Sequence, residues 1–167
     1  QQTANLIADT KTGRTDRKFS SAAWLTSGAL PRLLAVLDCD GEEARAVDLL
    51  VSLQELGMAR DVPRMTLTAL TEQVQLHALR GRVQTSSDLL AQLEAMRAVF
   101  EQPQYRAIAP HFRRSLTRAT ACLCLAKGDL DGAESALCGS VEATPGMRRN
   151  PMVLVARALM ALVSYER

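Results

Sequence analysis

Few side chains in this sequence could do covalent or metal chemistry, and their spacing does not bring them together. Cys122 and Cys124 are two residues apart; on a helix such residues point in nearly opposite directions and cannot easily chelate one ion. The two histidines, His77 and His111, fall in different predicted helices without a supporting cysteine or aspartate. Ser115 lies one helical turn after His111, but a serine nucleophile also needs an oriented base and an oxyanion hole. We therefore expect buried free thiols, no enzyme activity, and no metal or cofactor.

Arginine is the side chain that could bind a ligand. Basic residues cluster at Arg113, Arg114 and Arg118, and again at Arg148 and Arg149. No aromatic residues alternate with them and no recognition helix accompanies them, so DNA contacts are not expected from this chain. Solvated surface is the plain interpretation. The alternative is binding of an anion or a peptide, because a guanidinium presents a two-pronged donor to a carboxylate or phosphate.

The composition indicates an all-α protein. Of 167 residues 47% are hydrophobic and only 4% aromatic, and leucine and alanine dominate, which favours helices over a β-sandwich. A net charge of +2 implies neither a nucleic acid nor an acidic membrane as partner. No apolar run approaches the roughly 18 residues of a membrane span. Four cysteines without disulfide-framework spacing indicate the reducing cytoplasm.

Helical periodicity and helix-breaking residues predict a succession of helices and no strands. The predicted helices span 20–28, 30–37, 42–58, 65–79, 86–101, 104–127, 129–142 and 152–165. The helix over 104–127 is expected to bend near Pro110. Residues 1–18 are polar and are interpreted as a tail or a truncated element, and residues 19–167 as one helical domain. The chain does not begin with Met, so it would be either processed or, as we expect, cut from a longer protein.

Three glycines open the same short pattern, 40 and 47 residues apart. A small residue follows each glycine after five positions, and a leucine follows four positions later. The three copies are Gly41, Ala46 and Leu50; Gly81, Ser86 and Leu90; and Gly128, Ala133 and Leu137. Glycine can end a helix in the left-handed conformation, the small residue allows a close helix crossing, and the leucine packs back. The pattern therefore predicts stacked antiparallel helical hairpins, with Asp129 as an N-cap.

Stacked hairpins place the first helix of each pair along a concave groove. Counting back from Gly81 and Gly128 gives the positions that would face this groove. The predicted groove residues are Thr71 and Gln75 in one hairpin, and Ser115, Arg118 and Cys122 in the next. Arg118 is the expected anion-binding group among them.

The pattern G-x4-(A/S)-x3-L resembles the tetratricopeptide repeat around its interhelical turn. The third copy matches at Leu125, Gly128, Leu130, Ala133 and Leu137, with Pro145 near the usual closing proline. The first two copies depart from the repeat, with Glu43 and Val83 at the turn's aromatic position, and the spacing exceeds the usual repeat of about 34 residues. Phrases such as LPRLLAVLDCDGEEARAVDLL and LAKGDLDGAESAL look like the helical sensor region of MalT-like, LuxR-family bacterial transcriptional regulators.

The resemblance covers about residues 20–165 and implies an N-terminal ATPase module, a central helical-repeat region that senses a small-molecule inducer or a regulatory protein, and a C-terminal helix-turn-helix. Neither GxxxxGK(S/T) nor a helix-turn-helix segment is present in this sequence. DNA binding would therefore belong to a domain outside this chain. The alternative is a free-standing tetratricopeptide-like adaptor or chaperone that binds a protein or peptide.

The last predicted helix, residues 152–165, is apolar around most of its circumference. A helix of this kind is buried on two sides. We expect further repeats or a second copy of the chain to cover it, so that the isolated chain would form a homodimer through this face.

Overall fold

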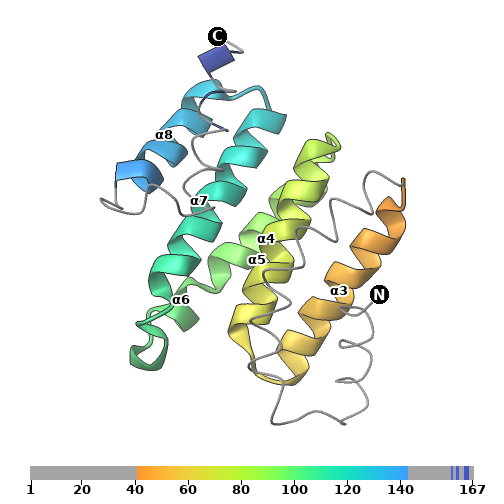
Figure 1. Cartoon of the computed structure of the whole chain (residues 1–167), viewed down its shortest axis with the longest axis vertical. Helices are drawn as coiled ribbons and strands as arrows, with labels where there is room; N and C mark the ends of the chain where they lie inside the picture. Colours follow the sequence, from red (N-terminus) through yellow and green to blue (C-terminus); the bar gives the residue numbers. More distant parts are fainter. Residues whose placement is uncertain (1–40, 143–158, 160, 162–163, 166–167) are drawn as a thin grey trace. The chain divides into compact units, whose positions relative to one another are not determined.

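The computed structural model describes residues 41–142 together with residues 159, 161, 164 and 165, and all of its regular structure there is helical. The helices are α3 (Glu43–Ala59), α4 (Pro63–Leu79), α5 (Val83–Ala95), α6 (Arg97–Phe100), α7 (Ala109–Ala126) and α8 (Leu130–Glu142), with a short 3-10 helix, η1 (Pro103–Tyr105) (Figure 1). The predicted all-α fold class is confirmed for these residues. The predicted tail 1–18 and the predicted helices 20–28 and 30–37 lie outside the described residues.

Two of the predicted helix boundaries are wrong. The helix predicted over 86–101 starts earlier, at Val83, and divides at Met96 into α5 and α6. The helix predicted over 104–127 begins only at Ala109, after the separate turn η1. Pro110 therefore lies in the first turn of α7 and causes no bend, because proline's missing amide hydrogen is not needed in a first helical turn.

The chain divides into two compact units, residues 1–72 and 73–167, with the boundary inside α4. In the first unit α3 approaches the start of α4 closely at Gly57. A β-carbon added at Gly57 would come within 2.8 Å of the backbone nitrogen of Thr66 and 3.0 Å of the Met65 side chain. Gly57 is itself buried, so a residue without a side chain is required at this crossing.

The glycine turns of the second unit have the predicted geometry. Gly81 follows α4 with a φ of 68°, and Gly128 follows α7 with a φ of 73°. After α7 the amide of Asp129 donates to the carbonyl of Cys124 at 2.9 Å, and the amide of Gly128 donates to that of Leu125 at 3.0 Å. This pair of bonds is the Schellman motif, which satisfies carbonyls that the end of a helix leaves free.

The loop after α3 in the first unit uses the same pair of bonds without a glycine. The amide of Val62 donates to the carbonyl of Gly57 at 2.8 Å, and the amide of Asp61 donates to that of Met58 at 3.3 Å. Asp61 takes the left-handed position with a φ of 49°. Aspartate tolerates this conformation better than most residues with a side chain, but less well than glycine.

The three copies of the glycine pattern have matching burial. The small residues Ala46, Ser86 and Ala133 are 1%, 0% and 0% exposed. The order of buried, partly buried and exposed residues is the same over 41–50 and 81–90. The order over 128–137 differs from it only at Gly132. In the second copy the Ser86 hydroxyl donates to the carbonyl of Val74 at 2.9 Å, which joins the start of α5 to α4 within the second unit. The three segments are therefore equivalent local structures.

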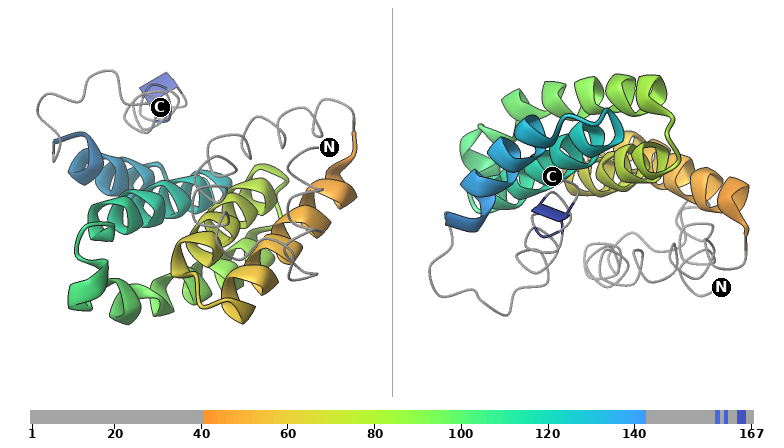
Figure 2. Two further views of the ribbon diagram at one scale, coloured as in Figure 1. Left: turned by 60° about the horizontal axis from the view of Figure 1, so that its bottom comes forward. Right: turned by 90° about the horizontal axis from the view of Figure 1, so that it is seen from above.

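In the second unit α7 and α8 form an antiparallel hairpin, side by side in Figure 1 and in both views of Figure 2. Ala121 of α7 and Leu137 of α8 are fully buried against each other, and Ala136 and Leu159 pack on them. Leu159 belongs to the last predicted helix, whose four described residues are helical. The predicted N-cap is confirmed, since the Asp129 carboxylate accepts from the amide of Gly132 at 2.9 Å.

Candidate functional site

The connection between α5 and α7 in the second unit is held by an aromatic cluster. The rings of Phe100 in α6 and Phe112 in α7 stack with centroids 4.9 Å apart and planes inclined by 17°. Tyr105 meets Phe100 edge-on at 5.9 Å. Phe100 and Phe112 are 1% and 3% exposed. In a chain with few aromatic residues, three of them fix this one connection against α7.

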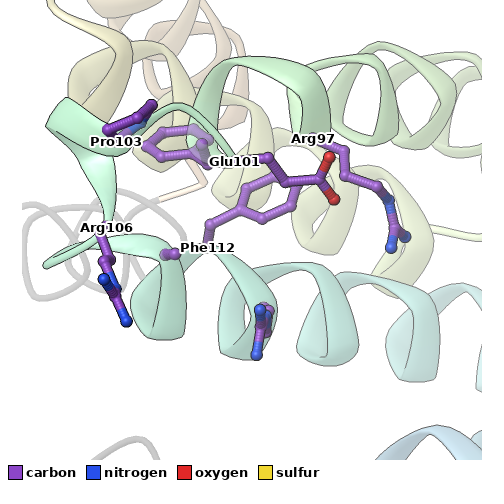
Figure 3. A pocket seen from close by; sticks show the side chains of 8 residues that line it. Arg97, Glu101, Pro103, Arg106 and Phe112 are labelled. Atoms are coloured by element: carbon purple, nitrogen blue, oxygen red, sulfur yellow. The ribbon is translucent and has the colours of Figure 1, made fainter.

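A cavity of about 370 Å³ opens beside the aromatic cluster (Figure 3). Its walls come from α6, from the segment containing η1 and from the first turn of α7. The lining residues are Arg97, Phe100, Glu101, Pro103, Arg106, Ala109, Phe112 and Arg113. The volume falls within the range of about 300–1,000 Å³ that is typical of small-molecule sites.

The rim of the cavity is positively charged, with three guanidinium groups and one carboxylate. Arg97, Arg106 and Arg113 are exposed, and none of the three forms an ion pair with another residue of the described part of the chain. Figure 3 shows Arg97 and Arg106 at opposite ends of the cavity, with Phe112 between them and the Glu101 carboxylate on the Arg97 side.

The lining of the cavity combines apolar surface with groups that can pair with an anion. Apolar carbon atoms of Phe100, Phe112 and Ala109 line the cavity, and the guanidinium groups at its mouth can each present a planar pair of N–H donors. Within residues 41–142 and the described positions after 158, no three His, Cys, Asp or Glu side chains gather as metal ligands. The cavity can therefore hold a ligand by burying its apolar part and pairing with its negative charge.

The five predicted groove residues do not line this cavity. Thr71, in the first unit, is 1% exposed, and its hydroxyl donates to the carbonyl of Leu67 at 2.7 Å. In the second unit Ser115 and Cys122 are 2% and 8% exposed. Gln75 and Arg118, also in the second unit, are partly exposed. A groove shared by these five residues stays a prediction, in which only Gln75 and Arg118 have accessible side chains.

The described cysteines are free, as predicted: Cys122 is buried, and Cys124 and Cys138 are partly buried. Burial raises the pKa of the Cys124 thiol, and the charge of Asp129 and a hydrogen bond from the thiol to it raise the pKa further. The positive charge of Lys127 acts in the opposite direction but is the smallest effect. Cys124 is therefore a protonated structural thiol at neutral pH.

The cavity was not predicted because residue 100 was placed inside the predicted helix 86–101, and residue 103 was placed in the break before the predicted helix 104–127. The sequence nevertheless contains a composition signal for a binding site in this segment. The 17 residues from Arg97 to Arg113 hold three arginines, two phenylalanines and a tyrosine, in a chain that is only 4% aromatic. Arginine and aromatic residues concentrated around a proline-containing connection are a feature of ligand-binding surfaces.

No protein-family model, curated protein or solved structure matches this chain. Among the helices that the structure describes, none combines the length and the apolar character needed to cross a bilayer.

Proposed function

We propose that this chain is the sensing helical-repeat region of a cytoplasmic bacterial transcriptional regulator of the MalT-like, LuxR-family type. Its role would be to bind a small-molecule inducer or a regulatory protein and to control a DNA-binding activity that resides outside this chain. Support comes from the tetratricopeptide-like pattern, and from three equivalent helix starts with matching burial.

The observation that carries ligand binding is the cavity between α6 and α7. Its three arginines have no ion-pair partner within the described residues, and its apolar wall can bury part of a ligand. A ligand in this cavity would contact α6, the η1 segment and α7 together. It would favour the conformations in which these three elements are held as they are here, and α7 would pass that preference to α8, its hairpin partner.

The test is a thermal-shift screen of the purified chain against metabolites, sugars and nucleotides, with the molar mass measured by light scattering. The informative variant is Ala109→Leu, which fills part of the cavity at the first position of α7, where leucine is well tolerated. A ligand that raises the melting temperature of the native chain but not of Ala109→Leu supports a sensor with its site in this cavity.

Two other results have separate meanings. If no ligand shifts the melting temperature and the chain is a stable monomer or dimer, the small-molecule sensor proposal fails and binding of a protein or peptide takes its place. A dimer that dissociates when Tyr165 is changed to Glu would support association through the last helix, where Tyr165 is 84% exposed.

A further inference from the structure

We infer that the cavity between α6 and α7 takes an organic anion in which a carboxylate or phosphate is joined to an apolar body. This inference rests on the proposed function, since it names the chemical class of ligand for the same site. The argument comes from the wall of the cavity, from the charges at its mouth and from the ligands that these two features disfavour.

The wall of the cavity selects an apolar group. Phe100 and Phe112 are nearly parallel, and both line the cavity although each is almost completely buried. Pro103 and Ala109 add carbon surface without hydrogen-bonding side chains. An apolar group can bury its surface against Pro103, Ala109 and the small exposed part of the two rings, whereas a sugar would lose hydrogen bonds to water without replacement.

The mouth selects a negative charge, and the arginines are not equivalent. Arg97 has Glu101 four residues later, on the same helical face and inside the same cavity, so its charge is partly offset. Glu101 is the only acid in the lining, and Figure 3 shows its carboxylate on the Arg97 side, away from Arg106. Arg113 has no acidic residue within ten positions in the chain. The anionic group of the ligand should therefore bind Arg106 and Arg113, with Arg97 contributing less.

The same features disfavour three other classes of ligand. A cation would be repelled by the excess of arginine. An inorganic anion alone would leave the apolar wall unused, and an uncharged apolar molecule would leave the guanidinium groups without a partner. Charge and apolar surface must therefore act together in the same ligand.

Four small probes separate these contributions: 2-naphthoate, 2-naphthyl phosphate, the uncharged 2-naphthalenemethanol and inorganic phosphate. Binding to the full chain is measured by isothermal titration calorimetry at low and at physiological salt. We expect at least one of the two naphthyl anions to bind at least tenfold more tightly than the alcohol and than inorganic phosphate. Preference between the two anions identifies a carboxylate or a phosphate as the natural head group. Higher salt should weaken the binding of both anions.

Variants of the chain test the site itself. The double substitution Arg106→Gln and Arg113→Gln should weaken binding of the tighter naphthyl anion at least tenfold and leave binding of the alcohol unchanged. The matched control Lys127→Gln removes one exposed positive charge at the other end of α7 and should leave both unchanged. Ala109→Leu should abolish binding of every naphthyl probe, and its melting temperature and circular dichroism confirm that it folds.

Each contrary result has one meaning. If the alcohol binds as tightly as the anions, or if Arg106→Gln with Arg113→Gln changes nothing, the inference is overturned, while the proposed function survives as long as Ala109→Leu still prevents binding. If no naphthyl probe binds but the metabolite screen yields a ligand that Ala109→Leu excludes, the inference fails and the sensor proposal stands. If neither the probes nor the screen yields a ligand, both are wrong.

Discussion

Two segments of the second unit reverse the direction of the chain, the α7–α8 turn and the α5–α7 connection. They are stabilised by different interactions. The turn uses three residues, 127–129, and both helix ends are closed by it: a Schellman motif ends α7 and the Asp129 carboxylate caps α8. The connection uses residues 96–108 and contains α6 and η1. Its backbone is hydrogen-bonded through successive short turns, but no side chain caps α6, η1 or α7.

The two segments differ in which side chains hold the fold and which remain exposed. In the α7–α8 turn the polar groups near the reversal are used to hold the fold, so little is left to bind a ligand. In the connection the aromatic rings of Phe100, Tyr105 and Phe112 hold the fold, and the charged side chains remain available at the surface. The longer glycine spacing, 47 residues against 40, coincides with this connection, because the corresponding loop after α3 has only residues 60–62.

The largest effect should come from removing the ring that anchors the connection. Phe112→Ala deletes a side chain that is 3% exposed and stacks on Phe100, and should lower the free energy of unfolding by about 3–5 kcal/mol. Urea denaturation followed by circular dichroism measures the change. The exposed neighbour Arg113→Ala is the control and should cost less than about 0.5 kcal/mol. Equal effects of the two substitutions would mean that the aromatic cluster does not anchor the connection.

Substitution of Gly128 in the α7–α8 turn should lower the free energy of unfolding less than Phe112→Ala does. Gly128→Ala puts a β-carbon on a residue with a φ of 73° and should lower the free energy of unfolding by about 1–2 kcal/mol. No atom lies within 4 Å of the added carbon, so the cost is conformational and not a clash. Gly128→Asn should cost less than Gly128→Ala, because asparagine tolerates the left-handed region. Thermal unfolding of both variants checks this order, and the reverse order would contradict it.

In the loop after α3 a glycine can be introduced where the chain has a left-handed aspartate, and this should stabilise the fold. Asp61→Gly should raise the free energy of unfolding by about 0.5–1 kcal/mol, because glycine adopts the left-handed φ of 49° without the strain of a side chain. Greater flexibility of glycine in the unfolded chain keeps the gain small. Asp61→Ala is the matched control: it removes the same carboxylate but keeps the β-carbon, and it should not stabilise the chain. A gain from Asp61→Ala would point instead to the charge.

The smallest effect concerns the thiol at the α7–α8 turn. Asp129→Asn keeps a good N-cap but removes the negative charge that raises the pKa of Cys124. The pKa should fall towards its ordinary value, and alkylation of Cys124 by iodoacetamide at pH 8 should become a few times faster. Mass spectrometry assigns the rate to Cys124, with Cys138 as the internal control. An unchanged rate would show that burial alone sets the pKa of Cys124.

The same thiol gives a pH dependence of stability. Because the pKa of Cys124 is raised in the folded state, its contribution is fully present below the ordinary thiol pKa, and it is lost as the pH rises through the folded value. Stability should therefore decline on the alkaline side, and it should decline less in Asp129→Asn and not at all from this cause in Cys124→Ala. Urea midpoints measured from pH 7 to 10 test this.

Local signals made the turns predictable from the sequence. Gly81 and Gly128 were expected to be left-handed and Asp129 to be a cap, and both follow from the chemistry of a few adjacent residues. The break at Met96 has no comparable signal, since the apolar periodicity continues from Leu93 to Phe100 without interruption. The need for glycine at position 57 was not predicted, because the sequence around it has ordinary helical periodicity. Only the close approach of α4 makes a side chain there impossible.

The site was harder to predict because it depends on packing between elements. Pro110 fits either a kink or a first helical turn, and the sequence does not distinguish them. Ser115 and Cys122 were placed in a groove by counting along α7, yet both are buried, since α7 packs against both α5 and α8. The residues that line the cavity come from α6, from α7 and from the segment between them, so no single helical periodicity in the sequence predicts them.

The capping bond at the start of α8 also restricts which substitutions evolution can accept there. A β-carbon added at Gly132 would meet the Asp129 carboxylate that accepts the Gly132 amide hydrogen. Glycine inside a helix costs about 0.5–1 kcal/mol relative to alanine, and a lost N-cap costs about as much, so neither residue gains by changing alone. Residues accepted at position 132 should therefore be those that leave the Asp129 carboxylate room to turn and still accept the amide hydrogen of residue 132.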